Sequence, residues 1–122
     1  MTSTAKEVSQ VEGSGQVMVT DTDKFEDDVL KNPLPVLLDF WGPQCGPCLS
    51  LMPSVKKLAA KYAGELAIYK IESRPNWRVA VKLKVSSLPT MILFKGEEEQ
   101  ARLTGDVTPA GIEQAIKEVL GV

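Results

Sequence analysis

The apolar positions of the chain fall into segments that alternate between strand-like and helix-like spacing. Strands are predicted for "QVMVT", "VLLDF" and "LAIYKIE", which are short and rich in branched residues. Helical spacing follows the first strand in "TDTDKFEDDVLKN", where Thr and Asp precede the apolar residues, and follows the third strand in "NWRVAVKLK". The run "VLLDF" contains a single acid and predicts a central, buried strand.

A long helix is predicted between the second and third strands, from Gly46 to Tyr62. Gly64 is placed to end this helix, and Pro53 inside it predicts a kink. Its apolar face is expected to consist of Leu49, Met52, Val55, Leu58, Ala59 and Tyr62.

The last third of the chain predicts a hairpin and a closing helix. The segments "TMILFK" and "QARLTG" are separated by the turn-prone "GEEE", which is typical of two antiparallel strands. The segment "TPAGIEQAIKEVL" starts with a Thr cap and a Pro at the first helical position. Together the segments predict an α/β fold, with a mixed sheet of about five strands flanked by about four helices.

Length and charge favour one small domain without a nucleic-acid or membrane surface. The chain has 122 residues, 43% of them hydrophobic, and its formal net charge of −2 comes with interspersed acids and bases. No apolar run approaches the roughly 18 residues of a membrane span. Nothing in the sequence demands more than a monomer.

The N-terminal sequence "MTSTAKEVSQVEGSGQ" has too little apolar content to order itself, so residues 1–16 are expected to form a flexible tail. Residues 17–122 would then form the domain. The tail lacks the apolar middle region of a secretory signal, and a cytoplasmic location is therefore expected.

Cys45 and Cys48 are the two cysteines of the chain, which has no histidine. A closed zinc site made by one chain needs about four Cys or His ligands, so no metal and no cofactor beyond the cysteines is expected. A purely structural bridge is poorly motivated, because so short a loop removes little entropy from the unfolded chain. Redox chemistry is the remaining interpretation.

The position of the pair between a buried strand and a long helix suits that chemistry. Cys45 should occupy the helix N-terminus, where free N–H groups and the helix dipole favour a thiolate and lower its pKa. Cys48 lies one turn further on and should be the more enclosed partner. Gly46 would allow a tight backbone approach, and Pro47 fits the first helical turn. Such a pair can attack a disulfide and then resolve the mixed disulfide.

Asp39 is the second candidate, because it stands among the apolar residues of the predicted central strand. A buried acid needs a partner or a function, and Asp39 could accept the proton of Cys48 through water. Lys70 in "LAIYKIE" is the cation expected beside it. A purely structural Asp39–Lys70 pair is the alternative.

Pro89 in "SSLPT" opens a predicted strand. A cis peptide bond there would aim the Leu88 backbone at a peptide ligand, whereas a trans bond would simply open an edge strand. Both alternatives are open from the residues alone. Trp77, Trp41, Leu88 and Met91 are candidates for an exposed apolar groove, with core packing as the competing interpretation.

The ordered set Asp39-Phe40-Trp41, Cys45-Gly46-Pro47-Cys48, Pro53, Leu88-Pro89-Thr90 and Gly105 resembles the thioredoxin family over about residues 17 to 120. The resemblance implies the thioredoxin fold, with Cys45 as nucleophile, Cys48 as resolving thiol, Asp39 as proton acceptor and Lys70 beside it. It also implies a cis Pro89 and hydrogen bonds from Leu88 to an extended substrate. Residues matching the family's substrate surface are Trp41, Gln44, Gly46, Pro47, Leu88, Pro89 and Gly105.

The implied function is a dithiol–disulfide oxidoreductase that reduces target proteins and receives electrons from an NADPH- or ferredoxin-linked thioredoxin reductase. Four residues depart from the family pattern: Gln44 replaces the usual Trp, Leu49 replaces a frequent Lys, and Arg74 and Trp77 occupy a usually more acidic segment. Gln44 supports the alternative of a redox-silent binding module. An oxidant or isomerase of an oxidising compartment is disfavoured by the Gly-Pro dipeptide and the missing signal.

Overall fold

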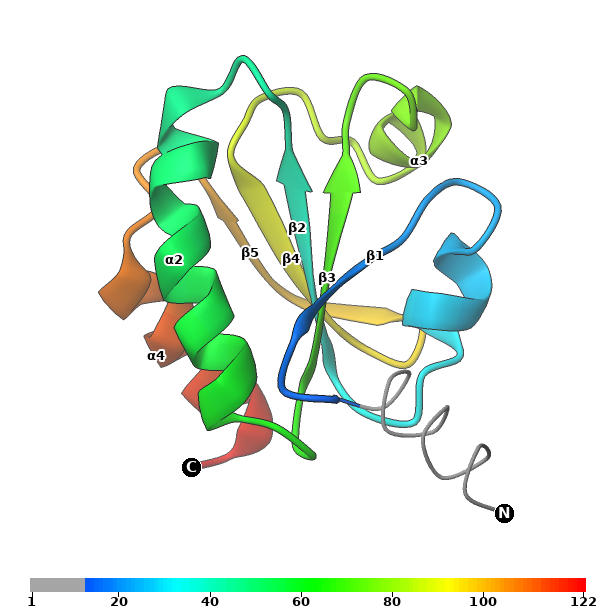
Figure 1. Ribbon diagram of the computed structural model, residues 1–122. Coiled ribbons are helices and arrows are strands. Elements are labelled where there is room, and N and C mark those ends of the chain that lie inside the picture. Colours follow the sequence, from blue (N-terminus) through cyan, green and yellow to red (C-terminus); the bar gives the residue numbers. More distant parts are fainter. Residues whose placement is uncertain (1–12) are drawn as a thin grey trace.

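The computed structural model describes residues 13–122, which form a five-stranded mixed sheet with the strand order β1-β3-β2-β4-β5 (Figure 1). Strands β1, β3 and β2 are parallel to one another, whereas β4 is antiparallel to both β2 and β5. The elements in chain order are β1 (Val17–Val19), η1 (Glu26–Leu30), β2 (Val36–Trp41), α2 (Gly46–Lys61), β3 (Ala67–Glu72), α3 (Trp77–Lys82), β4 (Thr90–Lys95), β5 (Glu98–Thr104) and α4 (Pro109–Leu120).

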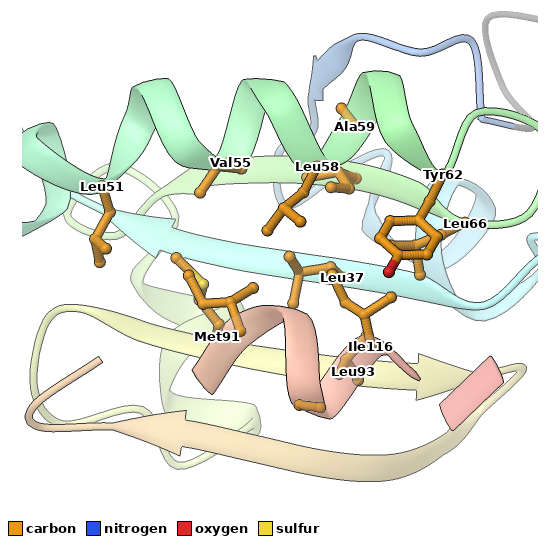
Figure 2. Close-up of a cluster of buried hydrophobic side chains, with 13 residues drawn as sticks. Leu37, Leu51, Val55, Leu58, Ala59, Tyr62, Leu66, Met91, Leu93 and Ile116 are labelled. Atoms are coloured by element: carbon orange, nitrogen blue, oxygen red, sulfur yellow. The ribbon is translucent and has the colours of Figure 1, made fainter. Parts of the chain in front are cut away.

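Both faces of the sheet are covered, as the strand and helix alternation predicts. Helices α2 and α4 pack on one face, and Figure 2 shows the buried cluster beneath them, in which Leu37 of β2 meets Val55 of α2 and Ile116 of α4. The opposite face carries a second cluster, built from η1, α3 and the sheet, that includes Leu38 and Phe40. Because successive strand residues point to opposite faces, β2 divides its side chains between the two clusters.

The predicted order of strands and helices is confirmed, but the first helix is a single π-helical turn. Asp21 starts this segment, since its side chain accepts a hydrogen bond from the Lys24 N–H at 2.9 Å. Helix α4 begins as predicted, with the Thr108 hydroxyl accepting from the Gly111 N–H at 3.0 Å.

The predicted apolar face of α2 is wrong at its N-terminal end. Leu49 is 47% exposed, and Leu51, which the prediction left out, is 7% exposed and belongs to the core. The buried stripe runs through Cys48, Leu51, Val55, Leu58 and Ala59. Since 3.6 residues make one turn, starting the stripe at Leu49 rather than Cys48 turns the first part of the face away from the sheet.

The hairpin has a shorter turn than the sequence predicts. Strand β5 begins at Glu98, which pairs with Lys95, so only Gly96 and Glu97 form the turn. Gly96 has a positive φ of 62°, a conformation that glycine adopts without strain. The polarity of the three glutamates predicts a turn. Because β5 is an edge strand, however, Glu98 and Glu99 can pair with β4 while their charged side chains remain in solvent.

Most of the expected tail, residues 1–12, lies outside the described residues. Gly13, which the sequence places in the same tail, already contacts the domain: its carbonyl accepts a hydrogen bond from the Gly64 N–H at 2.9 Å. Its φ is 82°, and a Cβ there would come within 2.8 Å of the Leu66 carbonyl oxygen. Within residues 13–122, no helix combines the length and the apolar character that a membrane span needs.

Candidate active site

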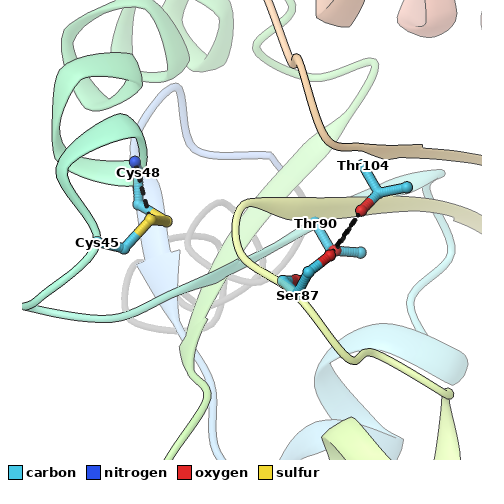
Figure 3. The surroundings of a disulfide bond; sticks show 5 residues. All are labelled: Cys45, Cys48, Ser87, Thr90 and Thr104. Atoms are coloured by element: carbon cyan, nitrogen blue, oxygen red, sulfur yellow. Dashed lines mark hydrogen bonds between the residues drawn. A yellow bond between two sulfur atoms is a disulfide. The ribbon is translucent and has the colours of Figure 1, made fainter.

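Cys45 and Cys48 are joined by a disulfide at the start of α2, with an S–S distance of 2.13 Å and a Cα–Cα distance of 5.3 Å (Figure 3). Cys45 is the N-cap of the helix, and its Sγ accepts a hydrogen bond from the Cys48 N–H at 3.2 Å. The helix therefore directs a free backbone donor at the first sulfur, as expected for a residue at this position.

The two cysteines differ in access to solvent. Cys45 is partly exposed, whereas Cys48 is 2% exposed and lies at the head of the buried stripe of α2. The pair thus has one sulfur that a partner can reach and one that it cannot reach directly.

The residues between the cysteines are both exposed and face away from the protein. Pro47 stands in the first turn of α2, where its missing N–H leaves no helical hydrogen bond unmade. The expected close approach at Gly46 is not found within the described chain, because no other group lies within 4 Å of the position of a Cβ there. The space beside Gly46 is open.

Asp39 is buried on the face of the sheet that α2 covers. It lies two residues after Leu37, so both side chains point to the same side, and Leu37 packs against the α2 stripe that begins at Cys48. Asp39 is 2% exposed, and its Oδ1 has no hydrogen-bond partner among residues 13–122. Burial raises the pKa of Asp39 to about 7, and the positive charge of Lys70 counteracts this in part.

Lys70 is the register partner of Asp39 on β3, which places both side chains on the same face of the sheet. It is only partly buried, and its Nζ lies 5.2 Å from the centroid of the Trp41 ring. The pair is therefore a carboxylate influenced by a nearby cation rather than a closed ion pair, since no Asp39–Lys70 contact falls among the salt bridges of residues 13–122. Trp41 lies beside this cation.

The Leu88–Pro89 peptide bond is cis, which decides between the two alternatives left open by the residues. Three hydroxyl groups hold the adjoining backbone (Figure 3). Thr90 donates its one proton to the Ser87 carbonyl at 2.7 Å, so Thr104 must donate to Thr90 and Ser87 must donate to Thr104, each at 3.1 Å. This closed ring ties the segment before β4 to the end of β5, directly before Gly105. Sequence reasoning missed Thr104 and Ser87, and no pattern in the chain singles them out.

The family comparison agrees with this geometry. The thioredoxin family model matches residues 16–118. The chain is 35% identical to thioredoxin 1 of a Nostoc species over 88% of its own length and 99% of the relative's. It is 31% identical to a chloroplastic M-type thioredoxin of Pisum sativum (89% of the chain, 63% of the relative), and 33% identical to a thioredoxin of a Synechocystis species (79% and 90%). The chain belongs to the thioredoxin family. As a thioredoxin homologue with a Cys-x-x-Cys disulfide, it has the redox centre of a thiol–disulfide oxidoreductase.

This thioredoxin-family chain has a groove of about 940 Å³ that begins at Cys45 and runs towards α3. Of the predicted site residues, it brings together Gln44, Cys45 and Leu88. Its lining consists of Gly42, Pro43, Gln44, Cys45, Glu72, Ser73, Arg74, Trp77, Ala80, Val81, Val85, Ser86, Ser87 and Leu88. A Cβ at Gly42 would lie 3.3 Å from a methyl carbon of Leu88, so the two loops that frame Cys45 pack closely.

The other predicted site residues are not among the described residues that line this groove. Gly46, Pro47 and Gly105 are exposed, Pro89 is buried, and Trp41 stands beside Lys70. Of the candidates for an apolar groove, Trp77 and Leu88 line it, whereas Met91 is 1% exposed and part of the core. Among residues 13–122, no group of three or more Cys, His, Asp or Glu side chains is arranged to hold a metal ion.

Proposed function

We propose that this protein reduces disulfide bonds in target proteins through Cys45 and Cys48. The observation that carries the proposal is the disulfide at the start of α2, with one accessible sulfur and one that is 2% exposed. An accessible thiol at a helix N-terminus is the part that must attack, and an enclosed thiol beside it is the part that must resolve.

The reaction starts from the reduced pair. The Cys45 thiolate attacks one sulfur of a target disulfide, which breaks the target S–S bond, forms a Cys45–target disulfide and releases the other target sulfur as a thiolate. Cys48 then loses its proton and attacks the Cys45 sulfur. This forms the Cys45–Cys48 disulfide and releases the second target thiolate, so that two electrons pass from the pair to the target.

Asp39 is proposed to take the proton of Cys48 through water. Its pKa of about 7 suits a group that must be ionised before the step and protonated after it near neutral pH. Its Oδ1, on the buried face of β2, has no hydrogen-bond partner among residues 13–122 and can therefore accept a hydrogen bond. Lys70 would keep a fraction of Asp39 ionised, because its positive charge lowers the pKa that burial raises.

Substrate contacts are proposed at the exposed surface around Cys45, which includes Gln44, Gly46 and Pro47. The Leu88 backbone would add hydrogen bonds to an extended target segment, and Pro89, Gly105 and Trp41 would shape the surroundings. A thioredoxin reductase, NADPH- or ferredoxin-linked, would return electrons to the pair. A monomer in the cytoplasm stays a prediction.

Two cysteine variants test the proposal. With pre-reduced protein and a disulfide-bonded protein substrate such as insulin, Cys45→Ser should abolish reduction, whereas Cys48→Ser should form a mixed disulfide with the substrate that accumulates. Ser50→Ala alters an exposed residue in the same helical turn and should behave as wild type. Full activity of Cys45→Ser would contradict the proposal.

The reduction potential of the pair separates the remaining functions. A value near about −270 mV indicates a reductant, and one between about −180 and −120 mV indicates an isomerase or oxidant. If alkylating both cysteines leaves the capture of a partner unchanged and the pair never cycles, the redox-silent binding module would be the better description.

A further inference from the structure

The groove between Cys45 and α3 has a composition that favours particular targets. Trp77 is 56% exposed and Val81 is 66% exposed, and they lie one helical turn apart on α3. Both line the groove together with Leu88. Trp77 and Val81 belong to neither core cluster of the described residues. Their exposed side chains therefore offer an apolar contact surface next to the reactive sulfur.

Positive charge accompanies this apolar surface. Arg74 lines the groove, and the Arg78 guanidinium lies 5.1 Å from the centroid of the Trp77 ring. The sequence from residue 73 to residue 96 contains five Lys and Arg residues and no acid, in a chain whose net charge is −2. Within residues 13–122, Glu72 is the one acid that lines the groove.

The loop and helix start that carry the disulfide add no charge of their own. From Phe40 to Val55 the chain has no Lys, Arg, Asp or Glu. The electrostatic character of the groove is therefore decided by Glu72, Arg74 and Arg78, with a net positive balance. Lys70 lies beside Trp41, on the face of the sheet that carries Asp39.

A target reaches this surface whenever it reaches Cys45. The loop that ends in Cys45 and helix α3 lie at the same end of the sheet (Figure 1), and Cys45 itself lines the groove. An extended chain advances about 3.3 Å per residue, so residues that flank the target cysteine by a few positions would lie along α3.

We infer that the groove lined by Trp77, Val81 and Arg74, with Arg78 beside Trp77, selects target segments that carry a large apolar residue next to an acidic residue, within a few positions of the cysteine that Cys45 attacks. The apolar side chain would pack on Trp77 and Val81, and the carboxylate would lie near the two guanidinium groups. This inference rests on the proposed disulfide reduction and names the class of segment that undergoes it.

Four synthetic peptides test the inference. Each contains the same small disulfide ring and differs only in two flanking residues: Glu-Leu, Lys-Leu, Glu-Ser or Lys-Ser. Pre-reduced protein is mixed with each peptide, and the second-order rate constant is measured in a single turnover, which needs no reductase. At low salt the Glu-Leu peptide should react about tenfold faster than the Lys-Ser peptide.

The protein variants assign that preference to the groove. The double variant Arg74→Glu/Arg78→Glu should abolish or invert the Glu-over-Lys preference, and Trp77→Ala should abolish the Leu-over-Ser preference. Lys56→Glu/Lys57→Glu makes the same charge change on an exposed part of α2 and should keep both preferences. If the glutamate variant does not fold by circular dichroism, Arg74→Ala/Arg78→Ala replaces it and should remove the charge preference. The Glu-over-Lys preference should shrink at about 0.5 M salt, whereas the Leu-over-Ser preference should persist.

Two results would overturn the inference alone, and a third would overturn the proposed function together with it. One is equal rates for all four peptides with wild-type protein that still reduces the uncharged 2-hydroxyethyl disulfide; the groove would then be unselective and the proposed function would stand. The other is an unchanged preference in the arginine and Trp77 variants. If wild-type protein reduces neither the peptides nor 2-hydroxyethyl disulfide, the proposed function fails and the inference fails with it.

Discussion

Replacing Asp39 by Asn should become more favourable for stability as pH rises, and it should stabilise the protein at about pH 8. Asp39 is 2% exposed and its Oδ1 has no hydrogen-bond partner in the part of the chain that the structure describes, so the folded state opposes ionisation of this carboxyl group. Its pKa rises from 3.8 to about 7, chiefly because of burial. A carboxyl group with a raised folded-state pKa binds its proton more tightly in the folded than in the unfolded state.

The sign and size of the effect follow from these two pKa values. Below pH 3.8 Asp39 is protonated in both the folded and the unfolded state, so its ionisation does not change the free energy of unfolding. Between pH 3.8 and about 7 Asp39 ionises in the unfolded state alone, so the free energy of unfolding falls as pH rises. The loss is complete above about pH 7. It amounts to about 4 kcal/mol at about pH 8 and about 2 kcal/mol at about pH 5. The Asn variant lacks this pH dependence. Its buried amide lowers the free energy of unfolding by about 1 to 3 kcal/mol at every pH if it makes no hydrogen bond.

The assay is urea unfolding of wild-type and Asp39→Asn protein at about pH 5 and about pH 8. The disulfide form is used, because its cysteines do not titrate and cannot contribute to the pH dependence. The stability difference between the two proteins should shift in favour of Asn by about 2 to 3 kcal/mol from the lower to the higher pH. Asp23→Asn, at an exposed carboxylate, is the matched control. A difference that is the same at both pH values, or larger at low pH, would refute the reasoning.

Three further predictions concern the Asp39–Lys70 pair, the core beneath α2 and the start of α4. Lys70→Ala should raise the pKa of Asp39 further, because the positive charge of Lys70 lowers it, and the midpoint of the pH-dependent stability loss should move to higher pH. Leu37→Ala should cost about 3 kcal/mol in urea unfolding, and Leu49→Ala less than about 0.5 kcal/mol, since Leu37 is 0% and Leu49 47% exposed; equal costs would contradict the packing described. Thr108→Ala should cost about 1 kcal/mol in thermal or urea unfolding by removing the hydrogen bond at the start of α4, whereas Thr108→Ser should retain most of the stability.

The sequence predicted the fold well because its hydrophobic pattern, capping residues and turn residues agree with one another. The segment "VLLDF" was predicted as a central buried strand, and all five of its residues are buried in β2. The same alternation predicted that Asp39 would be buried. Its missing hydrogen-bond partner could not be predicted, because that depends on what α2 and β3 place around it.

The errors arose where local patterns compete with tertiary packing. Leu49 fits a helical stripe as well as Leu51 does, and the position of the sheet under α2 decides which of them is buried. Glu98 has a low strand propensity but pairs with Lys95, because β4 offers its free edge. Met91 and Trp77 are both large and apolar, yet β4 is an inner strand and α3 is a surface helix.

The two faces of β2 separate the chemistry of this protein from its proposed selection of targets. Asp39, Lys70 and the buried Cys48 lie on the side that α2 covers, and under the proposed function they would govern proton transfer to and from the inner thiol. The groove lies towards α3, where under the further inference Trp77, Arg74 and Arg78 would contact a target without touching the inner thiol. Changes on the α2 side should therefore alter the rate of mixed-disulfide resolution and its pH dependence. Changes on the α3 side should alter which targets form the mixed disulfide, because Cys45 alone belongs to both.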